Sequence, residues 1–238
     1  MASEYLKKKY KDVKPDEKRE LTPEEKRRNW WDYHKWHVVI VVVLLALLVS
    51  GVWSALHQVK PDYQVAYVGE NALPDDTAAA LEACFAALGE DLNGDGSVVV
   101  RLAQYASSGG MDVQAAMAAE VKLMADVTGG ESYFFLLEDP EQFQRNCFCL
   151  CKLDGSLPAE DDDSAEGTCL SWEQCPVLAG MELGEYRYSL MGETVSGDSQ
   201  ELMSRLFIGR RGFWTEKETD LRAGCAALWE KLTEGAAS

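Results

Sequence analysis

The residues best suited to bind a metal ion are Asp91, Asn93 and Asp95, in the stretch DLNGDG. Their spacing matches positions 1, 3 and 5 of an EF-hand calcium loop, and Gly96 occupies the turn position. Position 12, where that loop needs a bidentate glutamate, is Leu102. The incomplete ligand set favours a turn between a helix and a strand, because Asn and Gly tolerate left-handed backbone. Calcium is the alternative, and we expect no other cofactor.

Five of the seven cysteines form a second candidate group. Cys147, Cys149 and Cys151 alternate in CFCLC, so a strand there would place all three on one face. Cys169 and Cys175 follow an acidic stretch. The five side chains allow three interpretations: buried or free thiols, a disulfide that ties down the acidic loop, or a metal site. The chain has no C-x-x-C pair, which argues against zinc and redox motifs, and an odd number of cysteines leaves one unpaired unless it joins two chains.

Arg210 and Arg211, in the stretch GRRG, form the only compact basic cluster after the first 60 residues. Two guanidinium groups suit bidentate contacts to a carboxylate or a phosphate, so this pair is the candidate ligand-binding site. The alternative is a strand end whose arginines pair with acidic side chains of the same domain. The excess of acidic residues favours such internal pairing.

The three histidines restrict the chemistry further. His34, His37 and His57 all flank one long apolar segment, so the chain beyond them has no Ser-His-Asp triad, Cys-His pair or histidine-ligated zinc. It also lacks the glycine-rich motifs that hold nucleotide phosphates. Paired Asp and Glu side chains are the only catalytic groups in ample supply. We therefore predict no catalytic residues and no enzymatic activity.

The apolar segment, Val38–Leu56, contains no charged residue and two polar ones, Ser50 and Ser54. As a helix, its 19 residues would span about 28 Å, close to the roughly 30 Å hydrocarbon core of a bilayer. A single segment in lipid can satisfy its backbone polar groups only as a helix, which predicts one transmembrane helix. A cleaved signal peptide is the competing interpretation, but 37 residues precede the segment and no clear A-x-A site follows it.

Charge is distributed unevenly about this segment. The first 37 residues contain 11 basic and 8 acidic residues, a net charge of +3, whereas the rest has 12 basic and 32 acidic residues, a net charge of −20. Lys60 is the one basic residue close behind the segment, and four lie close before it: Lys26, Arg27, Arg28 and Lys35. Basic flanks favour the cytoplasmic side, so we predict a cytoplasmic N-terminus and an extracellular C-terminal domain at the cell membrane. The acidic domain would repel nucleic acid, which excludes that partner.

Four segments follow from this pattern: a charged cytoplasmic tail (1–21), a juxtamembrane helix (22–37), the transmembrane helix (38–56) and an extracytoplasmic acidic domain (57–238). The stretch TPEE is a helix start, with Thr22 as N-cap, Pro23 at the first helical position and Glu25 completing a capping box. The block RNWWDYHKWH, followed by the apolar segment and an acidic α/β pattern, resembles membrane-anchored extracytoplasmic proteins of clostridia-type bacteria, a group without an assigned activity. That resemblance implies the topology.

Strand and helix patterns alternate in the outer domain. Apolar periodicity predicts, in chain order, a strand, helix, strand, helix and strand at Tyr63–Gly69, Asp75–Leu88, Ser97–Tyr105, Val113–Val127 and Ser132–Leu137. In the second helix, the stripe expected to face the core is Val113, Met117, Val121 and Met124. This order is typical of βαβ units, so we predict a three-layer α/β domain with a mainly parallel sheet and a βαβαβ core.

The remaining chain is less regular. Its patterns predict a short helix at Glu141–Arg145, strands at Cys147–Leu153, Tyr186–Met191 and Leu206–Phe213, an acidic loop at Asp154–Thr168, and a last helix at Lys217–Thr233.

The order DYQVAYVGE, helix, SVVVRLAQY, helix, GGESYFFLLEDP resembles one lobe of a type 2 periplasmic solute-binding protein. The matching positions are Met124–Glu131 and Tyr133–Leu137. The resemblance implies a ligand cleft beside these segments, although the 182 residues after the apolar segment are too few for two full lobes.

We therefore expect a single-pass membrane protein whose partners are the lipid bilayer and either a small ligand or another membrane or envelope protein. The alternatives are a cell-envelope hydrolase that uses paired Asp and Glu, and a structural subunit of a membrane complex. A pocket holding two carboxylates about 5–10 Å apart would favour the hydrolase. A flat apolar patch of several hundred Å² would favour a protein partner.

Overall fold

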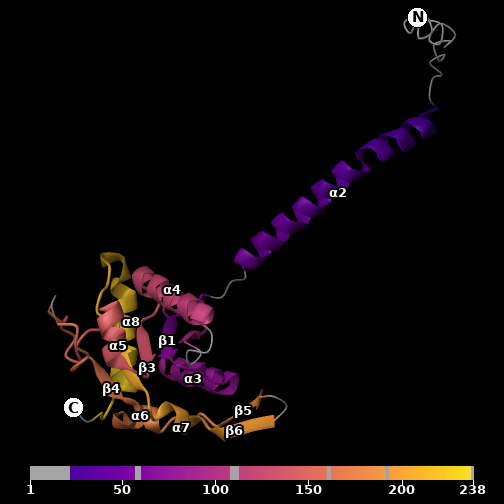
Figure 1. Ribbon diagram of the computed structural model, residues 1–238. Helices are drawn as coiled ribbons and strands as arrows, with labels where there is room; N and C mark the ends of the chain where they lie inside the picture. The colour runs from indigo at the N-terminus through magenta and orange to yellow at the C-terminus, as the bar shows by residue number, and fades with distance from the viewer. Residues whose placement is uncertain (1–21, 57–59, 108–112, 160–161, 191–192, 237–238) are drawn as a thin grey trace, which may run out of the picture. The chain divides into compact units, whose positions relative to one another are not determined.

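The computed structural model describes residues 22–56, 60–107, 113–159, 162–190 and 193–236 (Figure 1). The chain divides into two compact units, Met1–Gln58 and Val59–Ser238, which are described separately. The predicted tail 1–21 and His57 lie outside the described residues.

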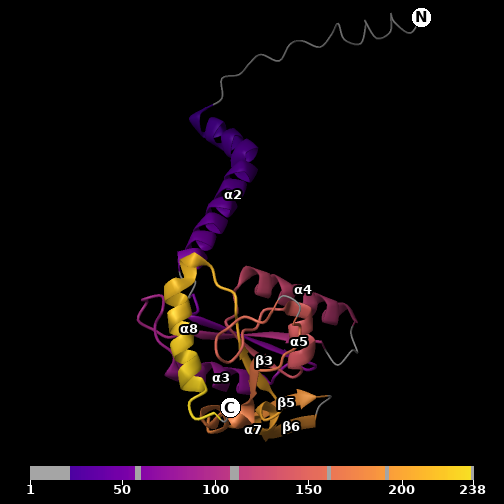
Figure 2. The same cartoon turned by 90° about the vertical axis from the view of Figure 1, so that its left-hand side faces the viewer.

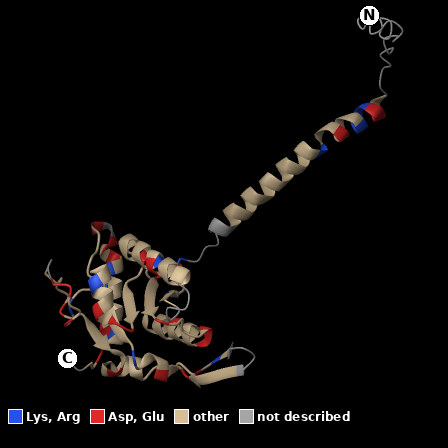
Figure 3. Ribbon diagram, in the orientation of Figure 1, with Lys and Arg blue, Asp and Glu red and all other residues tan. Residues whose placement is uncertain are grey.

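The first unit is one uninterrupted helix, α2 (Pro23–Leu56), of 34 residues. The predicted capping box is confirmed: the Thr22 backbone N donates to Glu25 Oε2 at 2.9 Å, and the Glu25 backbone N donates to Thr22 Oγ1 at 3.4 Å. Among the described residues, this is the one helix long and apolar enough to cross a membrane. Its charged residues gather at the N-terminal end (Figure 3).

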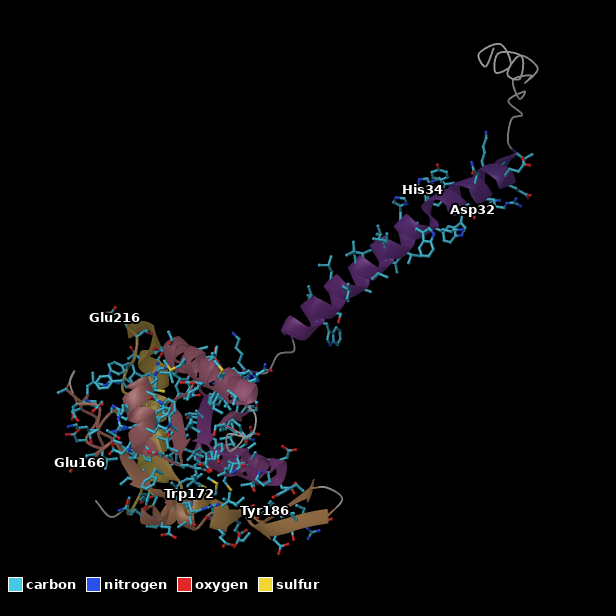
Figure 4. All side chains as sticks on the ribbon, viewed as in Figure 1. Asp32, His34, Glu166, Trp172, Tyr186 and Glu216 are labelled. Atoms are coloured by element: carbon cyan, nitrogen blue, oxygen red, sulfur yellow. The ribbon has the colours of Figure 1, made fainter. Side chains whose placement is uncertain are left out.

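The polar end of α2 is ordered by short-range contacts. The Trp30 and His34 rings stack with centroids 4.9 Å apart, and Lys35 Nζ lies 3.4 Å from Asp32 Oδ1. Asp32 and His34 are labelled on this part of the helix in Figure 4. Because these contacts join residues three or four positions apart, they support the continuous helix that the sequence predicts.

The second unit is built on a five-stranded sheet of order β2-β1-β3-β7-β4. The strands are β1 (Tyr63–Gly69), β2 (Val100–Ala106), β3 (Phe134–Leu137), β4 (Cys169–Ser171) and β7 (Phe207–Arg210). β1 lies parallel to β2 on one side and to β3 on the other, with Val65 opposite both Leu102 and Phe134. These three strands and the helices between them form the predicted βαβαβ core.

Helices cover both faces of the sheet. α3 (Asp75–Leu88) and α8 (Thr219–Leu232) pack on one face, and α4 (Val113–Gly129) and α5 (Pro140–Cys147) on the other (Figure 2). Side chains of β1 alternate between the two cores, as a strand requires. Val65 and Tyr67 pack in the cluster with α3 and α8, whereas Ala66 packs in the cluster with α4 and α5.

The prediction of a mainly parallel sheet is not confirmed, because the sheet is mixed. β7 runs antiparallel to β3, with Leu136 opposite Ile208, and β4 runs antiparallel to β7. A strand parallel to β3 would need a crossover that carries the chain back to the end of the sheet at which β3 begins. Here the chain enters β7 at Phe207, beside the carboxyl end of β3 at Leu137, and therefore runs back along it.

Helix α4 packs with a different face from the predicted one. Val113, Met117 and Val121 are 66 %, 62 % and 69 % exposed, whereas Leu123 and Asp126 are buried. Both faces of this helix repeat at helical spacing, so periodicity alone does not select between them. Beside Leu123 and Asp126 this face has small residues, Ala116 and Ala119, which are partly buried.

The predicted strand Cys147–Leu153 is wrong as well. α5 ends at Cys147, Phe148 adopts a left-handed conformation (φ 47°), and Leu150 alone forms a β-bridge, with Arg211. The predicted strand at Tyr186–Met191 exists as β5 (Glu185–Leu190), but it pairs with β6 (Glu193–Asp198) in a hairpin outside the main sheet.

Three short elements beside β4 were not predicted. They are the 3₁₀ turn η2 (Trp172–Gln174), α6 (Pro176–Ala179) and α7 (Ser199–Met203). Gln200 joins all three: it accepts from Trp172 Nε1 at 2.9 Å and donates to the Leu178 carbonyl at 3.1 Å. Trp172, labelled in Figure 4, is 1 % exposed. Contacts between residues distant in sequence therefore hold these short elements in place.

Candidate functional site

The carboxyl edge of the sheet contains the topological switch point of the core. The chain leaves β1 to form β2 on one side and then returns to form β3 on the other. Loops that leave two adjacent parallel strands in opposite directions open a crevice, and ligands of open α/β sheets bind there. Glu70 directly follows β1, and Glu138 and Asp139 directly follow β3.

Glu138 is held in a fixed orientation at this crevice. Its Oε2 accepts a hydrogen bond from the Glu70 backbone N at 2.8 Å, and its Oε1 lies 3.0 Å from the Tyr67 hydroxyl. Burial and the charge of Glu138 raise the pKa of Tyr67, so this hydroxyl stays protonated. A Cβ on Gly69 would lie 2.7 Å from Glu138 Cδ, so a larger residue there would displace this carboxylate. Asp139 caps α5 by accepting from the Gln142 backbone N at 2.9 Å.

Two cavities open on either side of this carboxylate. The first, of about 560 Å³, lies between the loop after β1 and the β5–β6 hairpin. Glu70, Glu138 and Arg205 line it together with Tyr186 and Tyr188, whose rings stack at 6.0 Å. Figure 4 labels Tyr186 on the hairpin. Aromatic faces beside carboxylates suit a cationic group, since the face of an aromatic ring attracts positive charge.

The second cavity, of about 580 Å³, runs between α4 and α5 and shares Glu70 and Glu138 with the first. Its apolar wall includes Met117, Leu123 and Phe143. Two further carboxylates, Glu120 and Asp139, line it, and no Lys or Arg is among its described lining residues. Because Val113 and Met117 also belong to the exposed stripe of α4, this cavity continues onto an apolar surface.

Comparison with protein-family models, with curated proteins and with solved structures found no match to this chain. The site is therefore interpreted from its own geometry. Its defining feature is the pair Glu70 and Glu138, which both cavities share at the switch point.

The predicted calcium loop forms a turn whose carboxylates bond to the backbone. Asp91 accepts from the backbone N of Gly94 and of Gly96, at 2.6 and 2.8 Å, and Asp95 accepts from Ser97 N at 2.9 Å. The buried Asp62 supports the loop from below by accepting from the backbone N of Leu92, Asn93 and Val99. Within the described residues, no group of three or more His, Cys, Asp or Glu side chains is placed to hold a metal ion.

Of the three cysteines predicted to share one face, Cys147 and Cys149 lie at the α4–α5 core, whereas Cys151 does not. All seven cysteines are free thiols in the structure. Cys149 packs in the α4–α5 core and Cys175 in the α3–α8 core, whereas Cys151 lies beside Arg210 in a third, smaller cavity. Cys147 and Cys169 border the α4–α5 core. Burial raises the pKa of Cys147 to about 11 and that of Cys169 to about 11, so both are poor nucleophiles at neutral pH.

Arg211 is engaged within the domain. Its Nη2 donates to Glu218 Oε1 at 2.8 Å, its Nε donates to the Phe213 carbonyl at 2.7 Å, and its Nη1 donates to the Gly130 carbonyl. The guanidinium lies 4.3 Å from the Trp214 ring centroid. Because the side chain is 6 % exposed and each of its three nitrogens donates a hydrogen bond within the domain, it connects the end of β7 to the start of α8.

Glu218 should contribute acid-sensitive stability. Hydrogen bonds from Thr215 and Arg211 lower the pKa of this carboxyl from 4.5 to about 2. Its contribution is full above pH 4.5 and is lost as the pH falls from 4.5 towards 2, because the unfolded chain takes up the proton first. We expect Glu218→Gln to lower the free energy of unfolding by about 1–2 kcal/mol at pH 6, and the difference from wild type to shrink at pH 3.

Thermal unfolding of the full chain in detergent, followed by circular dichroism at both pH values, measures this effect. Glu216→Gln is the matched control, since Glu216 is exposed and lies two residues away (Figure 4). A Glu218→Gln variant as stable as wild type at pH 6, or a difference that stays constant down to pH 3, would contradict the expected contribution.

Proposed function

We propose that this chain is a single-pass membrane protein whose outer domain binds a cationic ligand with apolar groups in the crevice at the carboxyl edge of its sheet. The observation that carries the proposal is the sharing of Glu70 and Glu138 by two cavities at the switch point. The apolar helix α2 supports a membrane anchor, and the basic residues before it favour a cytoplasmic N-terminus.

The charge of the crevice supports a cation. The lining of the two cavities includes four acidic residues, Glu70, Glu120, Glu138 and Asp139, and one basic residue, Arg205. The long-range field has the same sign, because the chain after residue 37 carries a net charge of −20. A field of that sign raises the local concentration of cations and speeds their association. The apolar wall between α4 and α5 would bury the apolar part of the same ligand.

Two synthetic peptides with identical apolar positions test this proposal, one with lysine and one with glutamate at every polar position. Fluorescence anisotropy with the full chain in detergent should show saturable binding of the lysine peptide alone. Met117→Ser should weaken binding about tenfold, since it removes one apolar contact of the wall. Glu120→Gln should weaken it about two- to fivefold, as expected for one exposed charge contact.

The chain offers a matched control for each variant. Val121→Ser changes an equally exposed apolar residue on the same helix that does not line the cavity. Glu173→Gln removes an exposed charge far along the chain, on η2. Equal binding of both peptides, or equal loss in Val121→Ser and Met117→Ser, would show that the crevice does not bind the cation.

The hydrolase is a second candidate, because Glu70 and Glu138 line the same two cavities. Paired carboxylates are the groups that cleave glycosidic bonds. Release of reducing sugar from cell-wall glycan by the full chain, abolished in Glu70→Gln and retained in Glu173→Gln, would favour this candidate over simple binding.

A further inference from the structure

A third cavity, of about 120 Å³, lies apart from the crevice, between β7, α8 and the loop that follows α5. Three arginines line it, Arg210, Arg211 and Arg222, together with the buried thiols Cys151 and Cys225. No acidic side chain is among its described lining residues. A concentration of positive charge is unexpected in a part of the chain whose net charge is −20.

The three arginines are not equivalent. Arg211 has a carboxylate partner in Glu218 and two carbonyl partners, so each of its three nitrogens already donates a hydrogen bond. Arg210 donates through Nη2 to the Leu153 carbonyl at 3.0 Å and lies over the Trp229 ring at 5.1 Å. Its Nε is buried without a hydrogen-bond partner. No ion pair joins Arg210 or Arg222 to an acidic residue within the described part of the chain.

A buried N–H of a cation without an acceptor is energetically costly, and such a group in a folded protein calls for a water, an ion or a ligand. A water needs about 10–15 Å³ of such space, so 120 Å³ is enough for a group of several atoms. Guanidinium groups bind carboxylates and phosphates bidentately and tolerate partial burial better than an ammonium.

We propose that this cavity binds a small oxyanion group, held by the Arg210 and Arg222 guanidiniums while Arg211 and Glu218 fix its wall. The bound group is a free anion or the anionic end of a larger molecule, since the cavity has room for little more. The site is independent of the cation-binding crevice, because the two share no lining residue.

Isothermal titration calorimetry of the full chain in detergent tests this site with inorganic phosphate and with acetate, at an ionic strength kept constant with sodium chloride. We expect saturable one-to-one binding of at least one anion. Glycerol 3-phosphate distinguishes the two sources: tighter binding than inorganic phosphate indicates the end of a larger ligand, and weaker binding indicates the free ion.

Two variants locate the binding. Arg222→Gln removes an exposed guanidinium and should weaken binding about tenfold or more, as expected for a charge-assisted contact. Arg210→Lys keeps the charge but removes the Nε–H, and should weaken binding by a similar factor. Arg187→Gln is the matched control, since Arg187 is exposed on the β5–β6 hairpin. Absence of binding by both anions, or equal weakening in Arg187→Gln and Arg222→Gln, would overturn the proposal.

Discussion

Replacing both Leu44 and Leu48 with arginine should remove most of the protein from the membrane fraction. The apolar segment has 13 Val, Ile and Leu residues, each of which favours insertion by about 0.3–0.6 kcal/mol. An arginine near the helix centre costs about 2.5–3.5 kcal/mol. One arginine is therefore offset by the remaining apolar residues, whereas two together cost about 6 kcal/mol and exceed the roughly 5 kcal/mol that the other residues supply. Resistance to carbonate extraction should stay near wild type in each single variant and be lost in the double variant.

Alanine at the same two positions is the control, since it shortens the side chains without adding charge. The double alanine variant should remain in the membrane. A protease added to intact cells should also remove a tag placed after the last residue of the wild-type chain, because the basic flank favours a cytoplasmic N-terminus. A double arginine variant that still resists extraction would contradict the anchor, and a tag reached only from inside would reverse the proposed topology.

The first half of the fold follows closely from local patterns. The predicted bounds of the strand Tyr63–Gly69 and of the helix Asp75–Leu88 agree with the structure, and the order of the βαβαβ core is confirmed. These elements are long, have a single apolar periodicity and are separated by glycine or proline. For such elements, local preference and tertiary packing agree, so sequence alone is sufficient.

The second half of the fold depends on contacts between residues that are distant in sequence, which local sequence patterns do not predict. β4 has three residues and α6 has four, too few for a period to be measured. Gln200 and Trp172, 28 positions apart, fix how these pieces meet. The stretch CFCLC alternates like a strand, yet the left-handed residue Phe148 caps α5 and turns the chain.

The candidate site was missed although a signal for it exists. Residue type alone selects Arg210, Arg211 and the calcium-like loop. The acidic residues Glu70 and Glu138 stand out only by position, because each directly follows a strand of the parallel core. Ligands bind where strands end at a switch point, so the predicted βαβαβ order is a signal that indicates both residues as candidates for the site. Tyr186 and Tyr188 could not be found in this way, since their hairpin lies far along the chain.

Replacing Asp126 with alanine should cause a large loss of stability in the second unit. Asp126 is 3 % exposed, and its Oδ1 accepts from the Ser132 backbone N at 2.7 Å. Its Oδ2 accepts from Ser132 Oγ at 2.6 Å, from Gln64 Nε2 at 3.2 Å and from the Tyr105 hydroxyl. One carboxylate thus joins α4 to β1, to β2 and to the residue that leads into β3. Burial and the bond to Asp126 raise the pKa of Tyr105, which keeps that hydroxyl a donor.

Alanine at this position leaves several buried donors without an acceptor, and each such donor costs about 1–3 kcal/mol. Rearrangement of the surrounding groups reduces the summed cost of these donors, so we expect a loss of about 3–5 kcal/mol in the free energy of unfolding. Asp126→Asn keeps the shape and one acceptor oxygen but turns an amide N–H₂ towards other donors, and should cost about 2 kcal/mol. Thermal unfolding of the full chain in detergent measures both, and the asparagine variant keeps the test informative if the alanine variant does not fold.

Tyr105→Phe tests whether the loss of stability comes from the hydrogen-bond network or from packing. It removes one donor without opening a cavity, and alone should cost about 1 kcal/mol. In the Asp126→Ala background the same change should cost nothing or restore stability, because the hydroxyl has already lost its acceptor. Additive losses in the double variant would mean that the two side chains do not act together. Other groups would then stabilise the buried carboxylate. The hydrogen bonds that join α4 to the two strands would make no measurable contribution to the free energy of unfolding.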